Sequence, residues 1–281
     1  MIRIVADSAA DFEPWELKEK NIDCVPLSVI FGDREYKENI DLTKEHFYEL
    51  LRSEKEMPRT SQPSPQDYLD IIDEARENGD DVIIVTISSG LSGTYQSVVA
   101  TKELACYDRC YVVDSLNGTG GERMIVEYAV RLRDEGVSAK EIVEKISALR
   151  SRVVLYTVMD TLEYLHRGGR ISSTVYKIGS IAHIKPIMHV SKEGKAEIPA
   201  KTMGISKGID FVVKHVEKDM PDEDFPFYVM FTEDRKNGEI LRERLEKIGV
   251  SVPENRIIPV GAVIGTHIGP GACAVVYIGK E

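Results

Sequence analysis

The residues best suited to chemistry lie between Asp81 and Val98. An apolar, β-branched run passes there through a short turn rich in serine and glycine, and then into a stretch of helical character. The first backbone N–H groups of a helix have no carbonyl partner, and glycine lets a ligand approach them closely. A carboxylate or a phosphate satisfies such donors, so this turn is predicted to hold an anion.

A second hydroxyl-rich segment runs from Arg59 to Pro65. Its two prolines indicate an extended approach to a helix, with Ser64 as the N-cap and Pro65 at the first helical position. Capping gives Ser64 and Pro65 a local role but leaves Thr60 and Ser61 without one. Thr60 and Ser61 are therefore candidates for ligand contact, and an ordinary helix entrance is the alternative.

The turn at Gly90–Thr94 also invites a comparison with serine hydrolases. It matches four of the five positions of the nucleophile elbow, with Thr94 in place of the last glycine. A catalytic triad would further need a histidine oriented by a carboxylate. Hydrolysis by Ser92 and His267 is thus the alternative function.

His267 stands in an unusually glycine-rich segment. Gly269 and Gly271 resemble part of a dinucleotide fingerprint, but Pro270 and the strand-like run from Ala274 argue against a phosphate-binding helix. The glycines instead predict a tight loop that presents His267, whose ring can donate to a carboxylate. A surface or core histidine is the alternative.

Arg170 follows the helix-ending pair Gly168-Gly169 and precedes another helical segment. Its guanidinium could pair with a carboxylate of the first domain and hold two domains together. It could also attract an anionic ligand, so Arg170 is a candidate for both roles. The sequence has no Walker motif for phosphate transfer from ATP.

The elements that position these residues alternate in the first half as in an α/β protein with a parallel sheet. Short apolar runs predict strands at Ile2–Ala6, Asp23–Ile30, Val82–Ile87 and Cys110–Asp114. Apolar residues at helical spacing predict helices through Tyr68, Ile71, Ile72 and Ala75, through Ile125, Tyr128, Ala129 and Leu132, and over Ala139–Arg150.

Three of the predicted strands end in similar residues, namely Asp7-Ser8, Ser88-Ser89-Gly90 and Asp114-Ser115. The carboxyl ends of parallel strands line one crevice, where open sheets bind their ligands. Aspartate and serine also cap helices, which is the structural alternative at each position. Their repetition favours a ligand site at this edge.

The second half is less regular and predicts antiparallel pairs. Two short runs flank Glu193-Gly194 as in a hairpin. Further strands are expected from Val153, at Phe227–Thr232, Arg256–Val260 and Ala274–Ile278, and helices through Val175, Ile178, Gly179 and Ala182 and through Ile209, Val212, Val213 and Val216. We predict two domains, residues 1–151 and residues 152–281, the second a mixed sheet packed by helices.

The composition excludes several classes of partner. With 281 residues and a net charge of −11, the chain would be repelled by nucleic acid and by anionic membranes. The start lacks the pattern of a signal peptide and no run reaches membrane-spanning length, so a cytoplasmic protein is expected. The four cysteines are scattered and predicted to be reduced thiols rather than metal ligands.

Five motifs in order resemble the DegV family of fatty-acid-binding proteins over the whole chain. They are Thr60–Pro65, Ser88–Thr94, Gly168–Ile171, Ile184–Ile187 and Gly265–Gly271. The resemblance implies an α/β/α first domain with a parallel sheet, an α/β second domain with a mixed sheet, and one long-chain fatty acid between them. It places the carboxylate against Thr60 and Ser92, with the Gly93 N–H and His267 as further donors.

The resemblance also implies a role without catalysis and without another cofactor. In the family, a separate ATP-dependent kinase phosphorylates the bound acid for phospholipid synthesis, so this chain would be a carrier that presents the acid. Lys201-Thr202-Met203 departs from the basic patch expected for kinase docking, although Lys207 is nearby. An isoprenoid or sterol-like acid is a third hypothesis, and the chain length and unsaturation of the acid stay open.

Overall fold

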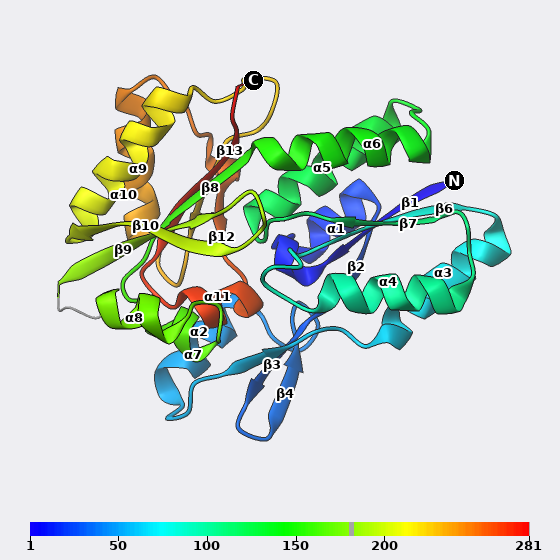
Figure 1. Cartoon of the computed structure of the whole chain (residues 1–281), viewed down its shortest axis with the longest axis horizontal. Helices are drawn as coiled ribbons and strands as arrows, with labels where there is room; N and C mark the ends of the chain where they lie inside the picture. Colours follow the sequence, from blue (N-terminus) through cyan, green and yellow to red (C-terminus); the bar gives the residue numbers. More distant parts are fainter. Residues whose placement is uncertain (180–182, 281) are drawn as a thin grey trace.

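The β-branched runs of the first half form a four-stranded parallel sheet in the order β2-β1-β6-β7 (Figure 1). The structure is a computed structural model that describes residues 1–179 and 183–280. The strands of this first sheet are β1 (Ile2–Asp7), β2 (Ile22–Val25), β6 (Asp81–Thr86) and β7 (Cys110–Asp114). The predicted parallel sheet is confirmed.

Helices cover both faces of the first sheet, as the apolar stripes predict. One face packs against α3 (Pro65–Asn78) and α4 (Thr94–Ala105) through a cluster that includes Tyr68, Ile72 and Val98. The other face packs against α5 (Gly120–Asp134) and α6 (Ala139–Leu149), with Ile125 and Ile146 fully buried. Together with α1 (Pro14–Lys20), these helices complete an α/β/α arrangement.

The predicted strand Asp23–Ile30 is wrong as a single element. Pro26 has no N–H for a sheet ladder and separates β2 from β3 (Ser28–Phe31). After this break β3 joins a separate antiparallel sheet in the order β4-β3-β5, with β4 (Arg34–Lys37) and β5 (Arg59–Ser61). The helix α2 (Lys44–Ser53) lies between β4 and β5 in the chain.

The second half forms a six-stranded mixed sheet in the order β10-β9-β8-β13-β11-β12. Neighbouring strands are antiparallel except β11 and β12, and β9 and β10 form the predicted hairpin. The strands are β8 (Val153–Val158), β9 (Ile184–Val190), β10 (Ala196–Met203), β11 (Tyr228–Phe231), β12 (Ile257–Pro259) and β13 (Cys273–Ile278).

The outer face of the mixed sheet is covered by α9 (Ile205–Asp219) and α10 (Lys236–Lys247). The predicted stripe Ile209, Val212, Val213 and Val216 is buried against that face. Three short helices are α7 (Glu163–Arg167), α8 (Ser173–Gly179) and α11 (Ala262–Ile268), of which α11 contacts α7 and the strands β3 and β5 of the small antiparallel sheet. Short 3-10 turns occur at Ser8–Ala10, Arg150–Arg152 and Glu254–Arg256, and Ala182 of the predicted α8 stripe lies outside the described residues.

The helix α5 joins the two halves, because it contacts β1 and β6 of the first sheet and β8 and β13 of the mixed sheet (Figure 1). The largest apolar cluster continues from one sheet to the other through this helix. The division at residues 151 and 152 stays a prediction. No helix in the described part of the chain is long and apolar enough to cross a membrane.

Candidate ligand-binding site

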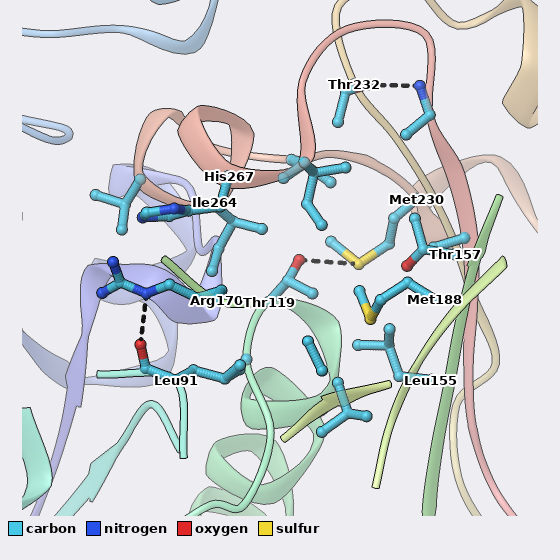
Figure 2. Close-up of a pocket in the computed structure, with 18 of the residues that line it drawn as sticks. Leu91, Thr119, Leu155, Thr157, Arg170, Met188, Met230, Thr232, Ile264 and His267 are labelled. Carbon is cyan, nitrogen blue, oxygen red and sulfur yellow. Dashed lines mark hydrogen bonds between the residues drawn. The ribbon is translucent and has the colours of Figure 1, made fainter. Parts of the chain in front are cut away.

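A largely apolar pocket lies where the loops after β6 and β7, the helix α11 and the inner face of the mixed sheet meet (Figure 2). Its free space is about 830 Å³, including the open mouth. The wall contains apolar side chains from every part of the fold, among them Leu27, Ile87, Leu155, Met188, Met230 and Ile264. A pocket with this apolar lining and a few polar groups suits an apolar or amphipathic small molecule.

Thr60 and His267 form a hydrogen-bonded pair in the pocket wall. The hydroxyl oxygen of Thr60 lies 2.8 Å from Nε2 of His267. Pairing of β5 with Val29 of β3 places Thr60 there, and His267 is in the last turn of α11 rather than in the predicted loop. Gly269, with φ of +77°, ends that helix. The antiparallel sheet that the sequence did not predict therefore brings Thr60 to the histidine.

The imidazole of His267 is neutral at physiological pH. Burial, and secondarily the positive charge of Arg170, lower its pKa to about 3. Its Nδ1 is buried and has no hydrogen-bond partner among the described residues. When the Nε2–H of the neutral ring donates to the Thr60 oxygen, the Thr60 O–H is left to donate to an anion, and no second full charge is placed in the pocket.

Arg170 lines the pocket and ties its two sides together. Its Nε donates to the carbonyl of Leu91 at 2.9 Å (Figure 2). Another guanidinium nitrogen donates to the carbonyl of Gly168. Within the described chain no carboxylate lies at ion-pair distance from Arg170. The predicted link across the structure exists, but its acceptor is a carbonyl, so the charge remains available to an anion.

Ser92 lines the pocket just before α4 begins, as the turn motif suggests. Its hydroxyl lies 2.9 Å from that of Thr94 and accepts from the Thr94 N–H at 3.3 Å. Gly93 is the N-cap residue of α4 but does not itself line the pocket, and a Cβ there would lie 3.3 Å from the Gln62 side chain. The structure thus brings Ser92 to the pocket and places Gly93 directly behind it.

Ser61 differs from its neighbour Thr60. Alternate residues of a strand face opposite sides, and Ser61 is not among the residues that line the pocket. Its hydroxyl donates instead to the carbonyl of Gln62 at 3.2 Å. The sequence could not separate the two because it did not predict β5 as a strand.

The pocket lies at the sheet edge where a ligand site is predicted, since residues of the loops after β6 and β7 line it, but the strand-end aspartates form a structural network. Asp7 accepts from the N–H groups of Ala9 and Ile87, and Asp114 accepts from those of Ser89 and Leu116. These side chains bind the loops that follow the strands, and neither aspartate lines the pocket. The repetition arises because each sharp exit from the sheet leaves N–H groups that need an acceptor.

Replacing Asp7 by alanine is expected to lower the free energy of unfolding by about 3 kcal/mol, because two buried N–H groups lose their acceptor. Chemical denaturation measures this loss. Ligand affinity of the folded fraction should stay within about twofold of the wild type. A large loss of affinity with unchanged stability would restore Asp7 to the site.

The atoms required for hydrolysis are not arranged as a triad. Ser92 bonds to Thr94, whereas His267 bonds to Thr60. No carboxylate accepts from the His267 ring within residues 1–179 and 183–280, since Nδ1 has no partner there. The same described region holds no cluster of histidine, cysteine and acidic side chains suited to a metal ion.

Sequence reasoning missed the residues that form most of the pocket. Thr119 and Gly118 precede α5, and Thr157 and Thr232 belong to the mixed sheet or its exit. Thr119 donates to the Asp11 carboxylate and contacts the Met230 sulfur at 3.3 Å. The alternation of apolar residues along β8 and β11 was the one signal for the positions that face inward. It does not show which of the two faces of the mixed sheet turns toward the pocket.

The comparisons with known proteins identify the family of this chain. A family model described as "Uncharacterised protein, DegV family" matches residues 1–280. A DegV domain-containing protein of Caldanaerobacter subterraneus subsp. tengcongensis is 34% identical over 278 residues, which cover 98% of both chains. The fold is that of a DegV-type α/β protein, and the chain belongs to the DegV family.

Two solved structures of fatty-acid-binding proteins have the same fold as this chain. A fatty-acid-binding DegV family protein from Thermus thermophilus has a TM-score of 0.88 and 28% identity, covering 99% of each chain. A stearic acid-binding protein from Eubacterium ventriosum has a TM-score of 0.87 and 26% identity, covering 99% of this chain and 98% of that one. Both relatives bind fatty acids according to their descriptions.

Proposed function

We propose that this protein binds one long-chain fatty acid in the pocket. The carboxylate lies against Thr60, Ser92 and His267, with the Gly93 N–H behind them and Arg170 nearby. The observation that carries this proposal is the position of a neutral histidine, hydroxyls and an arginine without a carboxylate partner in the described chain, all at one side of an otherwise apolar pocket. The fatty-acid-binding relatives of the same fold support it.

The tail supplies most of the binding energy in this arrangement. Burial of about fourteen methylene groups at about 0.8 kcal/mol each is worth roughly 11 kcal/mol before ordering costs are subtracted. The head group contributes orientation, because an unpaired buried carboxylate is unfavourable or takes up a proton. The hydrogen-bond donors around His267 therefore set the orientation of the bound acid, with the tail inside the pocket and the carboxylate at His267.

A carrier role follows from this orientation. The head-group residues Thr60, Ser92 and Arg170 are partly exposed, whereas the wall residues Leu155 and Met230 are buried. The carboxylate is thus at the accessible side, where a separate ATP-dependent kinase in the cytoplasm could act on it for phospholipid synthesis. Direct binding of that kinase, with and without the bound acid, tests this step.

The double substitution Ser92→Ala and His267→Ala is expected to weaken fatty-acid binding at least about 100-fold and so to lower occupancy, because the carboxylate loses two hydrogen-bond partners. Native mass spectrometry of the purified protein measures occupancy, and extraction identifies the acid and distinguishes fatty from isoprenoid or sterol-like acids. The matched control is Ser97→Ala with His46→Ala, since neither residue lines the pocket. Unchanged occupancy in the folded double variant would refute the proposed site.

The same variants separate binding from hydrolysis. We expect no turnover of short or long activated acyl esters by the wild-type protein. Turnover that Ser92→Ala abolishes would instead assign a hydrolase, with fatty acid as its product.

A further inference from the structure

One row of side chains crosses the inner face of the mixed sheet. The strand register sets Met188 beside Thr157, Thr157 beside Ala274, and Ala274 beside Met230. These residues come from β9, β8, β13 and β11, and all of them line the pocket. The pocket wall therefore contains a cross-sheet row of two thioethers, one methyl group and one hydroxyl.

Thr157 is the unusual member of the cross-sheet row. Its side chain is only 5% exposed, yet its hydroxyl has no hydrogen-bond partner among the described residues. The other inner threonines differ, because Thr119 donates to Asp11 and Thr232 accepts from the Ala272 N–H at 2.8 Å. Because this hydroxyl opens onto the pocket, an apolar chain that fills the pocket would leave it without a partner, a cost that valine of the same shape would avoid.

The position of Thr157 puts it along the tail of a bound acid. Figure 2 shows Arg170 and His267 on one side of the pocket, with Thr157, Met188 and Leu155 on the other. Leu155 and Thr157 are two residues apart on β8 and so face the same side of the sheet. A fatty acid whose carboxylate lies at His267 extends toward Thr157.

We propose that the pocket prefers acyl chains with an oxygen substituent, a hydroxyl or keto group, where the chain passes Thr157. This inference rests on the proposed function. A saturated chain offers the Thr157 hydroxyl no acceptor, whereas a hydroxyl or keto oxygen does. Met188 lies beside Thr157, and Met230 lies one strand further along the row, beyond Ala274; both carry flexible thioethers, which adapt to a substituent and accept weak hydrogen bonds.

The test compares stearic acid with a series of hydroxystearic acids that differ in the position of the hydroxyl. The wild-type protein is expected to bind one member of the series about tenfold more tightly than stearic acid. Thr157→Val should abolish this preference and leave stearic acid binding equal or tighter, while Thr157→Ser should retain the preference. Thermal unfolding of each variant establishes that it is folded.

The outcomes separate this inference from the proposed function. If stearic acid binds but no hydroxystearic acid is preferred, or if Thr157→Val keeps the preference, the role of Thr157 is refuted and the fatty-acid site stands. If neither stearic acid nor any hydroxystearic acid binds the folded wild-type protein, the proposed function fails and the inference fails with it.

Discussion

Replacing Gly168 by alanine is expected to weaken fatty-acid binding by about 100-fold. Gly168 has ordinary helical angles, φ −70° and ψ −8°, so alanine causes no backbone strain. Its Cβ would, however, overlap Nδ1 of His267 and lie 2.8 Å from Cε1 of the same ring. The imidazole must then move from its place beside Thr60, and a displaced donor costs binding energy of about 3 kcal/mol.

Isothermal titration with palmitate and oleate measures the effect of Gly168→Ala. The matched control is Gly279→Ala, because a Cβ at position 279 meets its nearest atom at 3.6 Å, an ordinary contact. Near-wild-type affinity of the folded Gly168→Ala variant would show that the position of the His267 ring is unimportant for binding. A loss of affinity in both variants would point to a general effect of glycine replacement.

The second large effect is a loss of stability in acid that depends on His267. Burial and Arg170 lower the pKa of His267 to about 3 in the folded protein, compared with about 6.5 for an unperturbed histidine. Between these values the unfolded chain binds a proton that the folded protein does not, so the folded state loses stability as the pH falls from 6.5 toward 3. Above pH 6.5 this contribution is constant.

The variant His267→Gln lacks this titration, so the wild type should lose about 2 kcal/mol relative to it between pH 7.5 and pH 4. This loss is smaller than the full shift of the His267 pKa would give, because the ring is partly exposed to solvent. Denaturant unfolding of both proteins across this pH range measures the difference in the free energy of unfolding. The contributions of all other titrating groups are the same in both proteins and largely cancel in that difference. A constant difference would mean that the folded protein takes up the proton. Imidazole signals in NMR spectra report that event directly.

The local spacing of apolar residues was sufficient to identify the longer strands and helices. The β-branched runs of β1, β6 and β7 and the apolar stripe of α9 identify the strands and helix that form, because burial of one face requires that spacing. Periodicity failed for β3, β4 and β5, which are short and not clearly alternating. A turn signal was present nonetheless, since Gly32, with φ of +58°, joins β3 to β4.

The candidate site was only partly predictable for the same reason. The types and local motifs of Thr60, Ser92, Arg170 and His267 indicated polar residues without a structural role, and the fold places all four in one pocket. Asp7 and Asp114 carried an equally suggestive pattern, yet their oxygens are occupied by loop N–H groups. Sequence shows which groups can bind an anion, but not which of them are already paired.

The sequence by itself determined the alternation of strands and helices, the acidic character of the chain and the segments that supply the head-group residues. Only the tertiary structure decided that Thr60 meets His267, 207 positions later in the chain, and that the Thr157 hydroxyl faces the pocket with no hydrogen-bond partner in residues 1–179 and 183–280. Local propensity and periodicity act between neighbours in the chain. The pairing of distant polar groups and the face that each strand turns to the pocket depend on long-range packing, which no local pattern encodes.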